Sequence, residues 1–490
     1  MLKTFAVLYY WFTYKNITFV KNKNKLTMHK QFFHSANEKF DKTVKRYEQF
    51  LEGKESGYFD VEELEEIVDY YLYKGKPRES KKALDFGLRL HPENTSLRTK
   101  RAKIYLATGH IKKAYNVLES LGQMNDDEGE LLKIETLVRL DRHHEAIAKA
   151  EKLISEESDF LDDICYEISI IFFYQLDFKT ALHFLLIGDK FNDKNIDLLF
   201  ELAFCYEQSD MTDKAIETYN RIIDIDSYIA EAWFNLGQIY FVHQDFNKAI
   251  DAYDFTIAIH ENDKLAYLQK AHALFHINHF DEALAIYADY ENNSLKKWQS
   301  MLFMAECYEK MEKYDVAIEY YKKSLTLHPK KNYDALTGIA VCLLDLENYS
   351  KSISFTLKAI AIDSNAPEVW VYLAEGLLGM EEEELALKAY LKSVNIDPNQ
   401  PDTLVAIAHI YMDMNNAEEA LEYYRTAFLL DETIENIDVY MAAAHFQLKN
   451  YSFVRDFLSL AVLRDANVLS LFYEICPEAL EMPELLTKNK

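Results

Sequence analysis

Apolar residues recur along most of the chain with the spacing of an amphipathic helix, and the predicted helices come in pairs. Residues 233–256 show one pair clearly. The first helix has an apolar face at spacings of three, one and three residues, formed by Trp233, Leu236, Gly237 and Tyr240. After a short polar stretch, a second apolar stripe runs through Ala249, Tyr253 and Thr256. This pattern predicts a helical hairpin whose two helices bury their apolar faces against each other.

The pair is repeated about every 34 residues. A small residue marks the start of the second helix twelve times, and we call these the landmark residues: Ser80, Ala114, Ala146, Ala181, Ala215, Ala249, Ala283, Ala317, Ser352, Ala386, Ala420 and, in the most degenerate copy, Val454. A fixed period in this range is typical of a stacked repeat array. Because each repeat buries its apolar face only against its neighbours, 490 residues do not require several globular domains.

Small residues and prolines predict where the two helices of a hairpin cross and where the second helix ends. Gly237 has small counterparts at the same point of other first helices: Ala203, Ala271, Ala305, Ala340, Ala374 and Ala408. A small side chain there allows the two helices to cross closely. Proline ends a helix, and three second helices are expected to end at His91-Pro92, His328-Pro329 and Asp397-Pro398.

The repeat resembles the tetratricopeptide repeat. The matching residues of one copy are Trp233, Leu236, Gly237, Tyr240, Ala249 and Tyr253, and those of a near match are Trp370, Leu373, Ala374, Ala386, Tyr390 and Pro398. The resemblance covers about residues 61–470 and is strongest in the middle repeats. It implies an all-α fold, a right-handed α-solenoid of about twelve helical hairpins with capping helices at both ends. It also implies that the first helices line a concave groove.

The chain is expected to contain four segments. Residues 1–27 are an aromatic and basic extension, which is either a targeting segment or the result of a misassigned start, with Met28 as the true initiator. Residues 28–59 contain an N-terminal capping helix, 60–466 the repeat array, and 467–490 a C-terminal capping helix and tail. Asp60 is expected to cap the first helix of the array, because its carboxylate accepts hydrogen bonds from free backbone amides.

The net charge narrows the choice of partner. The chain has 81 acidic and 54 basic residues and a formal charge of −27. Residues 1–27 contain five lysines and no acidic residue, so subtracting their charge leaves −32 for the rest. Nucleic acids and anionic membranes bind basic surfaces, so the repeat array is not expected to bind either. A basic protein would be attracted, although solubility alone also explains an acidic surface.

The groove is the expected binding site. Positions 18, 15, 11, 8 and 7 residues before each landmark share one helical face. In the middle repeats they include most of the candidate peptide-binding residues: Phe200, Phe204, Glu207, Glu231, Phe234, Gln238, Phe241, His272, Phe275, His276 and Glu306. Exposed aromatic residues with an acidic rim are typical of interaction sites. The alternative is that these phenylalanines pack between superhelical turns or against a chain terminus in the groove.

The nature of the partner follows from the same positions. Some relatives bind an acidic C-terminus through cations in the groove, but here the lining cations are few and far apart: Lys103, Arg139 and Lys310. A peptide with apolar anchors and some basic residues fits better.

No catalytic residues and no cofactor are expected. The chain has no phosphate-binding or nucleophile motif. Such motifs lie in glycine-rich loops, and the chain has only 12 glycines. His272 and His276 lie one helical turn apart and could hold a metal, but solvated or partner-contacting histidines are the favoured interpretation. Five widely spaced cysteines predict neither a disulfide framework nor a zinc site.

The resemblance implies a non-enzymatic scaffold or adaptor in the cytoplasm that binds a peptide or protein partner in the groove. One alternative is a membrane-associated or exported assembly factor of the envelope, tethered through residues 1–27. The other is a metal-dependent protein that uses His272 and His276.

Overall fold

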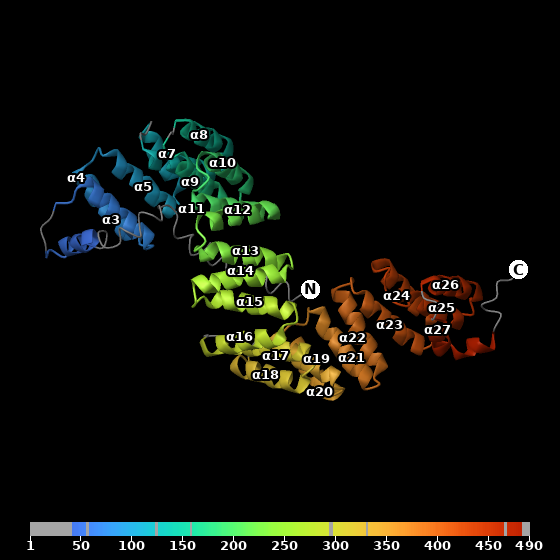
Figure 1. Ribbon diagram of the computed structural model, residues 1–490. Coiled ribbons are helices and arrows are strands. Elements are labelled where there is room, and N and C mark those ends of the chain that lie inside the picture. Colours follow the sequence, from blue (N-terminus) through green and yellow to red (C-terminus); the bar gives the residue numbers. More distant parts are fainter. Residues whose placement is uncertain are drawn as a thin grey trace. The chain divides into compact units, whose positions relative to one another are not determined.

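The computed structural model describes residues 42–54, 58–122, 126–156, 159–293, 297–329, 332–464 and 468–482. Every regular element in these ranges is a helix (Figure 1). Within the same ranges, none of the helices combines the length and the hydropathy that a bilayer-spanning segment needs. The predicted extension at residues 1–27 lies outside the described residues.

The helices form twelve hairpins, each with an A helix followed by a B helix, as predicted. The hairpins are α3 (Val61–Tyr73) with α4 (Pro77–Leu90), α5 (Thr95–Ala107) with α6 (Ile111–Ser120), α7 (Asp127–Arg139) with α8 (His143–Glu156), α9 (Leu161–Phe173) with α10 (Phe178–Phe191), α11 (Ile196–Gln208) with α12 (Thr212–Ile225), α13 (Ala230–Val242) with α14 (Phe246–Ile259), α15 (Lys264–His276) with α16 (Phe280–Asn293), α17 (Lys297–Lys310) with α18 (Tyr314–Leu327), α19 (Tyr333–Asp345) with α20 (Tyr349–Ile360), α21 (Pro367–Gly379) with α22 (Glu383–Ile396), α23 (Pro401–Asp413) with α24 (Ala417–Leu430), and α25 (Ile437–Gln447) with α26 (Tyr451–Arg464). A helix at residues 42–51 precedes them, and α27 (Leu469–Ile475) and the 3₁₀ helix η1 (Pro477–Glu481) follow.

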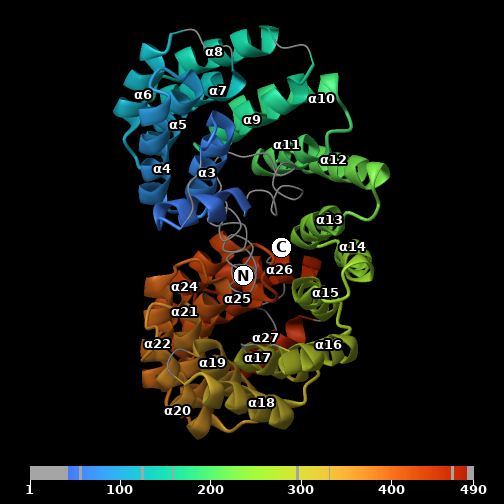
Figure 2. The same ribbon diagram turned by 90° about the vertical axis from the view of Figure 1, so that its left-hand side faces the viewer.

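The chain divides into two compact units, Met1–Ile239 and Tyr240–Lys490, which we call unit 1 and unit 2. The division falls within α13. In unit 1, each A helix contacts the next one along α3, α5, α7, α9 and α11. In unit 2, α17, α19 and α21 contact one another in the same order, and each packs beside its own B helix (Figure 2).

The landmark residues lie where the two helices of each hairpin cross. All twelve have no exposed surface. The Ser80 hydroxyl donates to the Val68 carbonyl oxygen at 2.8 Å, and the Ser352 hydroxyl donates to that of Ala340 at 2.9 Å. Contacts this short between a B helix and the backbone of an A helix need a small residue at the landmark position, which agrees with the predicted reason for the recurrence of these residues.

Each A helix ends in the same way, with a left-handed residue five positions before the landmark. In all twelve hairpins this residue has a φ between 54° and 77°, yet glycine occupies the position only twice, at Gly75 and Gly109. In the turn at Glu312, the next amide, that of Lys313, donates to the Tyr308 carbonyl oxygen at 2.9 Å. This hydrogen bond satisfies a carbonyl at the helix end and requires the left-handed residue between.

The predicted helix ends are confirmed. The Asp60 carboxylate accepts from the Glu63 amide at 2.8 Å, and the Glu63 side chain accepts from the Asp60 amide, so both residues cap α3. The helices α4, α18 and α22 end immediately before His91, His328 and Asp397, each of which is followed by proline.

A buried ion cluster joins the first three hairpins of unit 1. Lys100 lies 2.7 Å from Asp69 and 2.7 Å from Glu128, and Lys103 lies 3.0 Å and 2.7 Å from the same two residues. The side chains of Asp69, Lys100 and Lys103 are at most 7% exposed. Because α3, α5 and α7 each contribute to the cluster, it ties their A helices together.

Because of this ion cluster, we expect the free energy of unfolding to fall in acid. Burial opposes ionisation of Glu128, but Lys103 and Lys100 overcome it and hold the pKa at about 2, against an ordinary value of 4.5. A carboxyl whose pKa is lowered by folding stabilises the protein above its unfolded pKa, and the contribution is lost as the pH falls from about 4.5 to 2. After allowance for partial exposure, we expect Glu128→Gln to remove about 1–2 kcal/mol of this dependence. Urea unfolding followed by circular dichroism at stepped pH measures it, and equal slopes for both proteins would contradict the ion pairing.

Candidate functional site

All eleven predicted site residues lie on A helices. Phe200, Phe204 and Glu207 belong to α11; Glu231, Phe234, Gln238 and Phe241 to α13; His272, Phe275 and His276 to α15; and Glu306 to α17. The boundary between the two units falls after Ile239, so the six residues from Phe200 to Gln238 belong to unit 1 and the other five to unit 2.

The predicted residues of unit 1 combine packing with partial exposure. Phe200 packs against Tyr219 at 6.1 Å between ring centroids, and Phe204 packs against Phe173 at 5.1 Å. Both rings remain half-buried, as does Phe234. Glu207 accepts a 2.7 Å hydrogen bond from the Tyr219 hydroxyl and therefore also supports its own hairpin.

Two of the predicted residues are core residues. Gln238 and Phe241 are each only 6% exposed. The Phe241 ring packs against Phe246 at 5.3 Å and against His276 at 5.5 Å, which fills the turn between α13 and α14. Since a buried side chain cannot contact a partner, neither Gln238 nor Phe241 contributes groove surface in this structure.

The histidines make separate contacts. Nδ1 of His272 lies 2.8 Å from the Tyr287 hydroxyl, and burial together with His276 lowers the pKa of His272 to about 4. His276 is exposed and stacks on Phe246 at 4.7 Å. The part of the chain that the structure describes holds no group of three or more His, Cys, Asp or Glu side chains placed to bind a metal ion.

Two of the three lining cations are engaged within the protein. Lys103 belongs to the buried ion cluster. Arg139 pairs with Glu135 at 2.5 Å and donates to the Leu106 carbonyl oxygen at 3.1 Å. Lys310, at the end of α17, is exposed.

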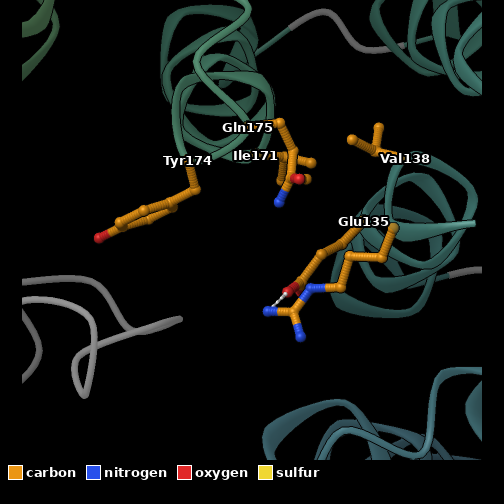
Figure 3. A pocket seen from close by; sticks show the side chains of 6 residues that line it. Glu135, Val138, Ile171, Tyr174 and Gln175 are labelled. Atoms are coloured by element: carbon orange, nitrogen blue, oxygen red, sulfur yellow. Dashed lines mark ion pairs between the residues drawn. The ribbon is translucent and has the colours of Figure 1, made fainter. Parts of the chain in front are cut away.

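A small pocket lies between α7 and α9 of unit 1. Figure 3 shows its lining residues, which come from α7, from α9 and from the turn that follows α9: Glu135, Val138, Arg139, Ile171, Tyr174 and Gln175. The free space is about 210 Å³ including the open mouth. Sites for small molecules usually measure about 300–1,000 Å³, whereas most of this space is open mouth and the enclosed part holds little more than one water molecule.

The surface around the pocket has a negative potential. Burial raises the pKa of Tyr174, and Glu201, Glu135 and Glu167 raise it further. Burial also raises the pKa of Tyr166, again with a contribution from Glu201. We call this surface the acidic A-face of unit 1 and define it by Tyr166, Glu167, Tyr174, Asp197, Phe200, Glu201 and Phe204; Glu135 is buried and paired with Arg139, so it is not part of the face. Among the described residues, no ion pair joins Asp197 to a basic side chain.

Unit 2 has a comparable surface on α17, α19 and α21. Burial raises the pKa of Glu375, and Asp345 on the neighbouring A helix raises it further. Burial, Glu368, Glu375 and Glu309 together raise the pKa of Tyr372 to about 12. Within the described ranges, neither Asp345 nor Glu375 forms an ion pair with a basic residue.

The lining positions of the repeat contain part of the sequence signal for the acidic A-face of unit 1. Tyr174 and Tyr166 lie 7 and 15 residues before Ala181, so they fit the lining positions of a repeat that departs from the common pattern. Glu201 lies 14 residues before Ala215, a position three and four residues from two lining positions and therefore on the same helical face. Adding the position 14 residues before the landmark to the lining positions therefore includes Glu201.

The consecutive helical hairpins define a helical-repeat protein of the α-solenoid class. Two family models described as tetratricopeptide repeat match the chain, at residues 263–432 and 197–226. These matches show tetratricopeptide repeats at residues 197–226 and 263–432, and the hairpins outside these ranges have the same buried landmark residues. Arrays of this family are scaffolds for protein–protein interaction, and this is the general function that the fold supports.

Several solved structures are similar to the chain. The APC/C hetero-tetramer Cut9–Hcn1 matches at 13% identity over 82% of this chain and 98% of that chain, with a TM-score of 0.39. MamA from Desulfovibrio magneticus RS-1 matches at 17% identity over 36% and 98%, with a TM-score of 0.33. YrrB, described as a TPR protein with an unusual peptide-binding site, matches at 16% identity over 39% and 98%, with a TM-score of 0.31.

Proposed function

We propose that the protein is a non-enzymatic adaptor whose A helices bind a basic segment of a protein partner, with apolar side chains of that segment as anchors. The observation that carries this proposal is the grouping of Glu167, Asp197 and Glu201 around Tyr166 on the adjacent A helices α9 and α11, which gives this surface a negative potential. A surface with such a potential attracts cationic residues and repels acidic ones.

Two features of the acidic A-face of unit 1 support apolar anchors. Phe200 and Phe204 each leave part of the ring exposed. Between α7 and α9, Val138 and Ile171 form the apolar part of a shallow depression. Short segments commonly bind repeat surfaces by placing a few side chains into such depressions while their charges face the rim.

The A helices of unit 2 provide a second surface of the same kind. Burial, with a contribution from the nearby Asp345, raises the pKa of Glu375 and so disfavours its ionised form. A lysine or arginine of the partner would stabilise the ionised form, which favours a cationic ligand here too. Each unit therefore has the chemistry to bind a basic segment by itself.

We propose the cytoplasm as the compartment. All five cysteines lie within the described residues, and all five are free and buried. Free thiols in this number are typical of a reducing compartment.

A peptide selection tests the proposed function. Random short peptides displayed against the full-length protein should be enriched in lysine and arginine next to large apolar residues. Glu201→Lys should weaken the binding of a selected peptide at least about tenfold, which corresponds to about 1.4 kcal/mol, because it places a cation at the centre of the binding surface. Fluorescence anisotropy with a labelled peptide measures the affinity.

Glu151→Lys is the matched control, because it makes the same charge change on an exposed part of the B helix α8. It should leave the affinity within about twofold, since charges beyond a Debye length of about 8 Å are screened at physiological salt. A selection without charge preference, or an equal loss in both variants, would show that the acidic A-face of unit 1 is not the binding site.

A further inference from the structure

We infer that residues 1–27 of this chain bind to the acidic A-face of unit 1 and compete there with the partner, an inference that rests on the proposed function of that face. The segment has the composition proposed for the partner. It contains five lysines and no acidic residue, and an apolar run extends from Thr4 to Tyr14. The protein would thus hold its own ligand, and a partner would have to displace it.

Charge complementarity supports this occupant. The chain without residues 1–27 has a formal charge of −32, and the segment has +5. On the acidic A-face of unit 1, Asp197 is exposed and forms no ion pair among the described residues, and Glu201 raises the pKa of two tyrosines. Lysines of the segment would be attracted to the negative charge of Asp197 and of the neighbouring carboxylates. A second copy of the array would instead bring more negative charge to the same surface.

Apolar complementarity points to the same face. The segment is rich in aromatic residues, including Tyr9, Tyr10 and Trp11. The face offers the half-buried rings of Phe200 and Phe204 and the shallow depression lined by Val138 and Ile171. Aromatic side chains are the preferred anchors of such surfaces because they bury a large area with few rotatable bonds.

The chain length permits the contact. Described structure begins at Lys42, in a helix whose Val44 and Tyr47 pack into the core of the first hairpin. Residues 28–41 can span at most about 46–50 Å when extended. Packed helices lie about 8–10 Å apart, so the three steps along the A helices from α3 to α9 amount to about 30 Å. The segment can therefore reach the face within its own unit.

Zero-length cross-linking of the full-length protein tests the location. A carbodiimide condenses a lysine amine with a carboxylate to form an amide, and the carbodiimide takes up the water as a urea, so only groups in contact are joined. We expect links from lysines of residues 1–27 to Glu167, Asp197 or Glu201, identified by mass spectrometry. A mixture of ¹⁴N- and ¹⁵N-labelled protein separates links within one chain from links between chains. Links that join these lysines only to other regions or only between chains would overturn the inference, as would a native protein that begins at Met28.

Competition tests the effect on binding. In the full-length protein, the lysines of the segment are replaced with serine: Lys3, Lys15, Lys21, Lys23 and Lys25. If the segment occupies the face nine tenths of the time, a selected basic peptide should bind this variant about tenfold more tightly than the parent. The control is a variant in which five exposed lysines of B helices are replaced in the same way, and its affinity for the peptide should equal that of the parent. These lysines are Lys81, Lys82, Lys322, Lys388 and Lys392.

The two proposals fail in different ways. If the selected peptide binds parent and variant equally and this binding depends on Glu201, the proposed function stands and the self-occupancy is wrong. If no peptide binding depends on Glu201 in either protein, the proposed function fails as well.

Discussion

Asp69→Ala is expected to destabilise the first hairpins of unit 1 by about 3–5 kcal/mol, because breaking a buried ion cluster leaves unpaired charges in the protein interior. Asp69 is 3% exposed and contacts both Lys100 and Lys103. Once its carboxylate is removed, Glu128 alone must compensate two ammonium groups. Hydrogen exchange followed by mass spectrometry should show loss of protection in α3, α5 and α7 first.

The exposed pair between Arg98 and Glu93 provides the control. Its side chains are 35% and 85% exposed, so Glu93→Ala should cost less than about 1 kcal/mol. If Asp69→Ala has an equally small effect, the cluster is not a significant source of stability.

Tyr321→Ala is the second change with a large expected effect, about 3–5 kcal/mol in unit 2, because it leaves a cavity among three helices. The Tyr321 ring is 2% exposed, and it fills the space beside Gly338, where a Cβ atom would lie 2.3 Å from the ring. Its hydroxyl donates to Glu309 at 2.5 Å. Thermal unfolding of the two proteins measures the difference.

Tyr321→Phe separates the ring from the hydroxyl. It keeps the packing and removes only the hydrogen bond, so it should cost about 1 kcal/mol. If the phenylalanine variant is as unstable as the alanine variant, the hydrogen bond to Glu309 and not the buried ring supports the hairpin.

The helical period alone predicts most of the fold. Residues at the landmark positions must be small wherever an A helix and a B helix cross, so a packing requirement is visible as a sequence repeat. All twelve hairpins, the cap at Asp60 and the three proline-marked helix ends follow from such local rules. These rules act within one hairpin, which explains why one sequence is enough to recognise them.

The candidate site was less predictable because it depends on contacts between hairpins. Helical spacing correctly places Gln238 and Phe241 on an A helix, but it does not say that a neighbouring turn covers Phe241. The buried ion cluster needs four side chains from three A helices, with Asp69 and Glu128 far apart in the sequence. No periodicity marks such a group. The sequence signal for Tyr174 is weak because its repeat matches the common pattern poorly.

The left-handed turns affect how this sequence can change over evolution. Ten of the twelve turn residues carry a side chain at a position where glycine would be unstrained: Asp141, Leu176, Asp210, Gln244, Asn278, Glu312, Glu347, Glu381, Asn415 and Lys449. Each costs up to about 1 kcal/mol relative to glycine, and the buried contacts of its hairpin outweigh that cost. Acidic residues, amides, a leucine and a lysine all occur in this one left-handed backbone conformation. The hairpin tips are therefore free to drift in sequence and charge while the stacking beneath them is maintained.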